Sequence, residues 1–502
     1  MQAEQTARKL ITVAQMRAAE QRAMAAGTSG AVLMERAGRA VADVICRASA
    51  AGRVAVLCGP GNNGGDGYVI ARVLQGRGFD VTIYGLVPTD ALAGDARAMA
   101  ERWEGPVHPP QRFIEEAVAP VVIVDALFGT GLGRAVDGQA GAMLDKANRF
   151  EGVDLRVAVD IPSGIDGDTG AINGVVFRAD RTVTFHAMKP GHLLQWGAEY
   201  AGTVEVADIG LGADATDFAI RATDGPDFIR NDAAPILFGM VRDPYGNKFT
   251  NGHALVIGGG LEGAGACRLA ARGALRAGAG LVTLGVPGSA LLAHAARGPD
   301  ALMPRRCDGV AGLEALLADK RRNAVVIGPA FGIGAETREA VATVLKSGRA
   351  CVLDADALTS FAGHDAELAA LTNANGRAVL TPHMGEFTRL FPDLTGLMRV
   401  NRAIAAAARL SAIVILKGRD TIIAAPDGRV AINTNAPAWL GTAGSGDVLA
   451  GLIGGFLAQG LAPFCAARAA VWLHGEAGQV AGRGLIADDL PEAVHQVLRS
   501  MV

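Results

Sequence analysis

The 502-residue sequence lacks several features that point to particular classes of function. Its formal net charge is −3, from 47 Lys and Arg against 50 Asp and Glu, so no positive excess indicates nucleic acid or an acidic membrane as a partner. No apolar run is long enough to cross a bilayer. The first ten residues, MQAEQTARKL, are polar, and we expect no secretion signal there.

Cysteine and aromatic residues are also scarce. The 6 cysteines are scattered without a Cys-x-x-Cys pair, which argues against disulfides or zinc and predicts reduced core thiols in a cytoplasmic protein. Aromatic residues make up 5%, whereas glycine is abundant at 67 residues. This combination is typical of an α/β protein with tight strand-to-helix turns, and the length suggests two or three domains.

The stretch GTAGSGDVLAGLIGG, residues 441–455, joins a glycine loop to a helix. Apolar residues recur at helical spacing after Asp447, so we expect a buried helix to begin at or just before it. The backbone amides of the loop can face an anion, which the helix dipole also favours. We expect the dipole to hold Asp447 ionised, where it can take a proton from a hydroxyl beside a bound phosphate. The structural alternative is a turn that packs the helix tightly against a sheet.

The N-terminal half contains strand ends rich in side-chain oxygen. The pattern Gly59-x-Gly61-x-x-Gly64 follows a predicted strand, 53–58, and opens a helix, as in dinucleotide-binding folds. The next strand ends without an acidic residue for a ribose hydroxyl, which argues against an ordinary dehydrogenase.

Two later strands end at Asp125 and Asp160, with Ser163 close behind. In an open α/β sheet the strand ends line one crevice, so we expect these three residues to converge with Asn63 and Asp66. Such hard-oxygen ligands of low charge suit a monovalent or weakly held cation better than zinc. The alternative, that Asp125 and Asp160 only cap turns, stays open for each taken singly.

A domain boundary is expected near residue 228, because the segment 211–248 has no clean strand pattern. The second half, 229–502, reads as a separate α/β unit. In it Asp354 and Asp356 end one strand, and residues 412–429 predict a hairpin that acts as a lid over a nucleotide. His383 follows another strand, and we expect it to contact a ligand; the alternative is a structural histidine.

Several motifs resemble known enzymes. TAGSGDVLAGLIGG, PHMGEF, LKGRDTI, LDADAL and IGPAFG together resemble the ADP-dependent NAD(P)H-hydrate dehydratases, relatives of the ribokinase superfamily. LMERAG, GNNGGDG, VDALFGTGL and DIPSGIDGDTG resemble the NAD(P)H-hydrate epimerases. In this order on one chain they resemble the bifunctional NAD(P)H-hydrate repair enzymes of bacteria. The resemblance implies two three-layer αβα domains, a Rossmann-like epimerase domain over 1–228 and a ribokinase-like dehydratase domain over 229–502.

The resemblance also implies site residues. In the epimerase domain the implied substrate contacts are Asn62, Asn63, Gly64, Gly65, Asp66, Gly129, Thr130, Gly131, Leu132, Gly133, Arg134, Ala135 and Asp160. The implied potassium ligands are Asn63, Asp125 and Ser163. In the dehydratase domain the implied contacts with the hydrated nucleotide are Ala266, Gly332, His383 and Asp447. Those with ADP, accompanied by Mg²⁺, are Lys417, Gly418, Arg419, Asp420, Thr421 and Gly446.

The implied chemistry is the repair of a damaged NADH or NADPH that carries a hydroxyl on its reduced nicotinamide ring. The first domain interconverts the R and S epimers, with Asp160 as the acid–base group. The second dehydrates the S form at the expense of ADP, giving AMP and phosphate. Asp447 deprotonates the hydroxyl, and the amides of residues 443–446 stabilise the transferred charge. We further expect a cytoplasmic homo-oligomer that acts on small molecules, without a nucleic-acid or membrane partner.

Two other functions remain open at this point. One is a ribokinase-like kinase for a vitamin-precursor alcohol, fused to an accessory domain. It would use ATP and would not release NADH. The other is a non-catalytic nucleotide sensor, against which the presence of both Asp160 and Asp447 argues, because a sensor needs neither base.

Overall fold

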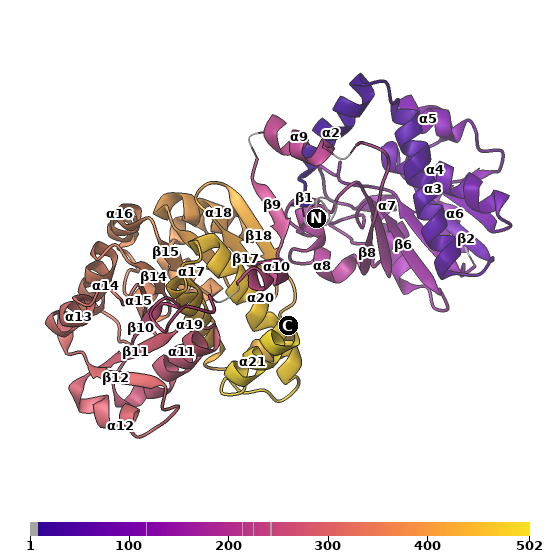
Figure 1. Ribbon diagram of the computed structural model, residues 1–502. Coiled ribbons are helices and arrows are strands. Elements are labelled where there is room, and N and C mark those ends of the chain that lie inside the picture. The colour runs from indigo at the N-terminus through magenta and orange to yellow at the C-terminus, as the bar shows by residue number, and fades with distance from the viewer. Residues whose placement is uncertain (1–8, 117, 213, 224, 241–242, 502) are drawn as a thin grey trace. The chain divides into compact units, whose positions relative to one another are not determined.

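The computed structural model describes residues 9–116, 118–212, 214–223, 225–240 and 243–501. The polar N-terminus expected to lack a secretion signal falls mostly outside the described residues, because residues 1–8 are not among them. The chain divides into two compact units, residues 1–228 and 229–502 (Figure 1). No helix in the described part of the chain combines the length and the apolar character needed to cross a membrane.

The first unit contains a 7-stranded parallel sheet in the order β4-β3-β2-β5-β6-β7-β8. Its strands are β2 (Arg53–Cys58), β3 (Asp80–Gly85), β4 (Val107–His108), β5 (Val122–Ala126), β6 (Leu155–Val159), β7 (Arg181–Phe185) and β8 (Thr203–Ala207). Its helices are α2 (Val13–Ala25), α3 (Gly30–Ala48), α4 (Asn62–Gly76), α5 (Gly94–Ala100), α6 (Pro110–Glu116), α7 (Gly138–Arg149), α8 (Gly197–Tyr200) and α9 (Ala215–Ala222). Short pieces are β1 (Lys9–Leu10), η1 (Thr89–Ala91) and η2 (Pro190–His192), with β9 (Asp227–Arg230) at the unit boundary.

Helices cover both faces of this sheet. Successive residues of a strand point to opposite faces. Val54 and Val56 of β2 accordingly share a core with α3 and α4. Ala55 and Leu57 share a second core with α7. The unit is therefore a three-layer αβα structure, as expected.

In the second unit a parallel array runs in the order β12-β11-β10-β13-β14-β15-β16, and β17 and β18 extend it antiparallel. The strands are β10 (His253–Ile257), β11 (Leu281–Val286), β12 (Leu302–Arg306), β13 (Ala324–Ile327), β14 (Ala350–Leu353), β15 (Ala378–Leu380), β16 (Ile413–Leu416), β17 (Thr421–Ala424) and β18 (Arg429–Asn433). The helices are α10 (Ala234–Phe238), α11 (Ala264–Arg276), α12 (Leu291–Ala295), α13 (Gly309–Leu317), α14 (Ala335–Lys346), α15 (Asp356–Thr359), α16 (Asp365–Asn375), α17 (Met384–Leu390), α18 (Arg399–Leu410), α19 (Ser445–Ala458), α20 (Pro463–Ala481) and α21 (Leu490–Ser500). The 3-10 turns are η3 (Leu261–Gly263), η4 (Gly288–Ala290), η5 (Pro392–Leu394) and η6 (Ala438–Leu440).

Helix α19 is buried along almost its whole length, against α11 and the sheet. Glycines permit this close approach. A Cβ atom at Gly451 would lie 1.9 Å from the carbonyl oxygen of Ala270, and one at Gly454 would lie 2.3 Å from Val326 Cγ2. Tight packing thus explains the glycines inside the helix. It does not explain Gly446, where the nearest atom to a Cβ would be the side-chain nitrogen of Lys417, 3.4 Å away.

Candidate active sites

A cavity of about 430 Å³ lies in the first unit, where the carboxyl ends of the parallel strands meet α2. The expected substrate residues that line it are Asn62, Asn63, Asp66, Gly129, Thr130, Gly131, Leu132 and Asp160. The others do not. Gly64 and Gly65 are buried in α4, where a Cβ would strike Gly59 or Met34. Gly133, Arg134 and Ala135 are exposed.

Asp160 follows β6 directly and is nine-tenths buried. Its Oδ1 atom accepts hydrogen bonds from Lys189 Nζ at 2.8 Å and from Thr184 Oγ1 at 2.9 Å. Its Oδ2 atom accepts a longer bond, 3.3 Å, from the backbone N–H of Thr130. Burial would raise the pKa of Asp160, but the Lys189 ammonium and the hydrogen bonds outweigh it and lower that pKa to about 2. Asp160 is therefore ionised at neutral pH.

Two further carboxyl groups line the same cavity, Asp66 from α4 and Glu20 from α2. Burial, followed by the negative charge of Asp160, raises the pKa of both, that of Asp66 well above its usual range. The cavity thus combines a carboxylate of lowered pKa with two carboxyl groups whose pKa is raised. Separated pKa values of this kind are what a site needs to exchange protons in both directions.

Asp125 and Ser163 lie next to the cavity but do not line it. Asp125 accepts hydrogen bonds from the Ser163 hydroxyl at 2.7 Å and from the Ser163 backbone N–H at 2.8 Å. Burial raises the pKa of Asp125 to about 6. The side-chain nitrogen of Asn63 is buried without a hydrogen-bond partner in the described part of the chain. The structure thus brings Asn63, Asp66 and Asp160 together in the cavity lining. Asp125 and Ser163 pair with each other beside it.

In the second unit Asp447 lies in the first turn of α19, as expected. Gly444, just before the helix, adopts a φ of 87°, in the left-handed region that glycine tolerates. Burial, followed by the charge of Asp354, raises the pKa of Asp447 to about 7. The expectation that the helix dipole holds Asp447 ionised is therefore wrong, because desolvation and neighbouring carboxylates outweigh a dipole effect of about 1 kcal/mol or less.

Lys417 lies among these carboxyl groups. Its Nζ atom donates to Asp354 Oδ1 at 3.0 Å and lies 4.0 Å from Glu386 Oε2. Burial lowers the pKa of Lys417, but the carboxylates raise it by more. The ammonium also lies 3.4 Å from the place that a Cβ of Gly446 would take, so it faces the glycine loop before Asp447.

The hairpin expected around Lys417 is present, formed by β16 and β17. Every residue of both strands is buried, so the hairpin extends the sheet and is not a separate lid. Only its turn remains available to a nucleotide. Within the turn Gly418 and Arg419 are exposed, whereas Asp420 is buried in an ion pair with Arg399.

His383 is the N-cap of α17. Its Nδ1 atom accepts hydrogen bonds from the backbone N–H groups of Gly385 at 2.9 Å and Glu386 at 3.3 Å. His383 thus has a structural role as the cap of this helix. The side chain is 55% exposed, so a ligand contact by the rest of the ring stays a prediction. Ala266 lies in the first turn of α11, and the N–H of Gly332 donates to Asp356 Oδ2 at 2.9 Å.

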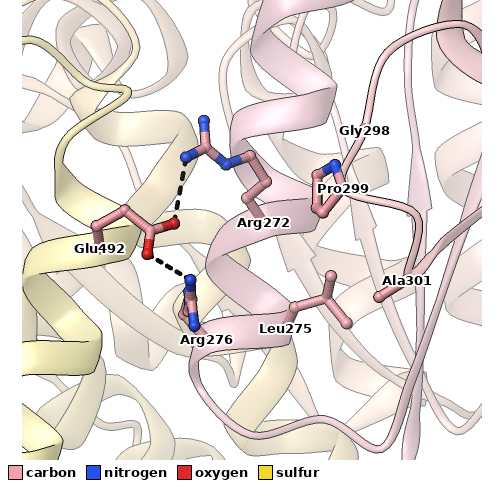
Figure 2. A pocket seen from close by; sticks show the side chains of 7 residues that line it. All are labelled: Arg272, Leu275, Arg276, Gly298, Pro299, Ala301 and Glu492. Carbon is pink, nitrogen blue, oxygen red and sulfur yellow. Dashed lines mark hydrogen bonds and ion pairs between the residues drawn. The ribbon is translucent and has the colours of Figure 1, made fainter.

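The second unit contains a cavity of about 480 Å³, which is lined by Arg272, Leu275, Arg276, Gly298, Pro299, Ala301 and Glu492. Figure 2 shows the Glu492 carboxylate between the two guanidinium groups, with both of which it pairs. None of the expected site residues lines this cavity. In the described part of the chain, no cluster of three or more His, Cys, Asp or Glu is arranged to hold a metal ion.

Comparison with known proteins matches both halves of the chain. Residues 30–191 match the family described as YjeF-related protein N-terminus, and residues 254–498 match the family described as NAD(P)H-hydrate dehydratase. The bifunctional NAD(P)H-hydrate repair enzyme Nnr of Moorella thermoacetica is 37% identical over 505 residues, covering 94% of this chain and 92% of its own. The protein of the same name from Salinibacter ruber is 38% identical over 507 residues, with the same coverage. The chain belongs to the family of bifunctional NAD(P)H-hydrate repair enzymes.

The sites of this family member include residues that sequence patterns did not single out. Lys189 and Thr184 contact Asp160, but neither belongs to a recognisable motif, because Thr184 lies within β7 and Lys189 shortly after it, and only packing brings them to Asp160. Ser445 and His474 are hydrogen-bonded at the start of α19, with 3.0 Å between His474 Nε2 and the Ser445 carbonyl oxygen. A lone lysine before Pro-Gly, and a histidine within a helix, carry no signal that sequence analysis could use.

Proposed function

We propose that this chain repairs hydrated NADH and NADPH. Residues 1–228 act as the epimerase and residues 229–502 as the ADP-dependent dehydratase. The observation that carries the proposal is the near-full-length similarity to the bifunctional repair enzymes, together with one aspartate of shifted pKa in each unit, the buried Asp160 and the half-buried Asp447. Perturbed pKa values in concave or glycine-lined sites are typical of catalytic groups.

In the epimerase site Asp160 is the ionised acid–base group, and the wall from Gly129 to Leu132 offers backbone groups to the substrate. The loop has little side-chain bulk, so a flat ring can approach Asp160 closely. Burial and the charge of Asp160 raise the pKa of Asp66 and of Glu20, which limits the negative charge that accumulates around Asp160. Gly133, Arg134 and Ala135 are exposed beside the cavity-lining loop, and we propose that they contact the part of the substrate that lies outside the cavity.

Potassium is proposed at Asn63, Asp125 and Ser163. The residues present fit such an ion on two observations. The amide end of Asn63 is buried with an unpartnered atom, and amide nitrogen and oxygen are interchangeable by a flip that would present oxygen instead. Asp125 is a fully buried carboxylate whose pKa is raised, which an adjacent cation would reverse. When bound, the ion supplies fixed positive charge next to the cavity.

In the dehydratase site Asp447 takes the proton from the substrate hydroxyl as that oxygen attacks the terminal phosphorus of ADP. The O–P bond forms as the bond between that phosphorus and AMP breaks. The C–O bond of the ring then breaks to release phosphate, and a proton leaves the adjacent ring carbon so that its electron pair re-forms the double bond of NADH. Lys417 and the backbone amides of residues 443–446 stabilise the negative charge on the transferred group. Ala266, Gly332 and His383 are proposed to hold the hydrated nucleotide, and the turn 417–421 with Gly446 to hold ADP.

Mg²⁺ is proposed to accompany ADP. Asp354, Glu386 and Asp447 face a single lysine, so the site is more negative than positive before ADP enters, and the ion supplies the compensating charge. We also propose a cytoplasmic location, which the free cysteines support. We further propose a homo-oligomeric state.

The test is to incubate the protein with both epimers of hydrated NADH and ADP and to follow NADH absorbance. Both epimers should be converted to NADH. Without ADP, the epimers should interconvert faster than they do spontaneously, and no NADH should form. A protein that phosphorylates an alcohol with ATP and yields no NADH would instead be the kinase considered above. One that binds nucleotide without turnover would be a sensor.

A further inference from the structure

The segment that follows β7 lies against Asp160, and its Lys189 lines the same cavity. Lys189 is fully buried, and its ammonium donates to three acceptors: Asp160 Oδ1 at 2.8 Å, Thr184 Oγ1 at 2.9 Å and the carbonyl oxygen of Phe185 at 3.3 Å. An ammonium has three hydrogens. All three are thus engaged, and Lys189 has no free proton to offer a substrate.

His192 holds the backbone of the same aspartate. The N–H of Lys189 donates to His192 Nδ1 at 3.0 Å, which leaves the ring hydrogen on Nε2. Nε2 then donates to the carbonyl oxygen of Asp160 at 2.8 Å. Burial, followed by the charge of Lys189, lowers the pKa of His192 to about 4, so the ring is neutral, as this bonding pattern requires.

The backbone of Asp160 needs such support. Its φ of 65° lies in the left-handed region, which is strained for a residue with a side chain and persists only where the surroundings enforce it. The strained turn directs the carboxyl group toward Lys189 and Thr184. Oδ1 accepts both of these bonds. Oδ2 accepts one longer bond, 3.3 Å, from the backbone N–H of Thr130 and faces Gly129, where a Cβ would lie 3.3 Å away, so its second lone pair stays open.

We propose that Lys189, Thr184 and His192 form a clamp of positioning residues that leaves only Oδ2 of Asp160 free to exchange a proton with the substrate. This clamp is a refinement that rests on the proposed epimerase function. The titratable groups that face Asp160 from other elements are Glu20 and Arg17 on α2 and Asp66 on α4, all of which line the same cavity. The charge of Asp160 helps to raise the pKa of Glu20 and of Asp66, whereas Lys189 lowers that of Asp160.

The first experiment removes one donor of the clamp without changing its shape. Thr184→Val keeps the volume of the side chain and loses the hydroxyl, whereas Thr184→Ser keeps the hydroxyl. The matched control is Thr182→Val, since Thr182 is equally buried on β7 but donates to the carbonyl oxygen of Ala201 at 2.7 Å instead. We expect Thr184→Val to lower the epimerase kcat about tenfold with KM changed less than about twofold, a fraction of the 10²–10⁴-fold that a general acid–base group supplies. Thr184→Ser should restore most of it, and Thr182→Val should leave kcat unchanged.

The second experiment measures the pH profile of Lys189→Met at saturating potassium, after subtraction of spontaneous interconversion. Wild-type epimerase should keep its activity down to about pH 4, because Asp160 stays ionised. Without the ammonium the pKa of Asp160 rises, so the acid limb of the variant should move to higher pH. The dehydratase rate and melting temperature of each preparation report folding.

The outcomes separate the clamp from the function on which it rests. If wild type does not epimerise, the proposed function fails. If wild type epimerises but Thr184→Val and Thr182→Val have the same epimerase kcat, the proposed clamp is wrong. It is also wrong if Lys189→Met folds and shows the wild-type pH profile, or if these variants change only KM.

Discussion

At the scale of single residues, the two aspartates proposed as bases are tuned in opposite directions. Asp160 pairs with a buried lysine and titrates at about 2. Asp447 lies near Lys417 too, but Asp354 forms the hydrogen bond with that lysine, and the pKa of Asp447 rises to about 7. Burial raises the pKa of both groups, and the partner of each decides the difference between them: Lys189 outweighs burial at Asp160, whereas Asp354 adds to it at Asp447.

Replacing Asp447 by Asn tests its role as base. The change keeps the size of the side chain and much of its preference for a helix start, so the melting temperature should stay within a few degrees. Dehydration should fall about 10²–10⁴-fold because a positioned general base is lost. Epimerisation, assigned to the other unit, should not change. NADH recovery at saturating ADP decides the matter: a folded variant within a few-fold of wild type would remove Asp447 from the mechanism.

The raised pKa of Asp447 predicts the pH dependence of dehydration. Only the ionised carboxylate accepts a proton, and its fraction grows as pH rises through about 7. The dehydratase kcat/KM should therefore increase nearly tenfold per pH unit below about pH 6 and level off above about pH 8. The measurement is kcat/KM against pH, with NADH detected by a method whose response does not change with pH. A flat profile between about pH 6 and about pH 8 would contradict the assignment of Asp447 as the base.

Replacing Asp125 by Ala tests the potassium site. The loss of a buried carboxylate that accepts bonds from Ser163 should destabilise the first unit by about 1–3 kcal/mol and abolish activation of the epimerase by potassium. Dehydration should be spared. The measurement is the epimerase rate against potassium concentration, with sodium at constant ionic strength; a wild-type response would show that the ion binds elsewhere.

At the scale of elements, the closeness of α19 to α11 aligns the glycine loop with the strand ends. Gly451→Ala would place a Cβ 1.9 Å from the Ala270 carbonyl oxygen, so the helices must separate. Overpacking of this kind costs about 1–3 kcal/mol. Gly265→Ala, on the exposed side of α11 with no atom within 4 Å of the new Cβ, is the matched control and should be neutral or stabilising. The measurement is the urea concentration at the midpoint of unfolding of each variant. Equal midpoints would show that α19 and α11 can separate without a loss of stability.

At the scale of the whole molecule, the chain splits into two compact units at residue 228. Each has its own sheet and its own proposed site, so the activities should be separable. A fragment of residues 229–502 should dehydrate one epimer with ADP and leave the other at its spontaneous rate of interconversion. Complete consumption of both epimers above that rate would contradict the division of labour.

Local patterns in the sequence were enough to predict most elements. The helix after the glycine loop begins at Ser445, within two residues of Asp447, because such signals depend only on neighbouring residues. Strand ends that converge at one edge follow from parallel topology, so Asp160, Asp66 and Asn63 could be grouped in advance.

Protonation and long-range partners depend on contacts that no local pattern contains. Lys189 reaches Asp160 across 29 positions, and Asp354 meets Lys417 across 63. The charge of Asp447 was misjudged for this reason: a helix dipole can be inferred from the sequence, but burial and a second carboxylate come only with the fold. Sequence alone therefore determined which chemical groups are available, whereas the tertiary structure decided their charges and orientations, because electrostatic energy depends on distance and desolvation.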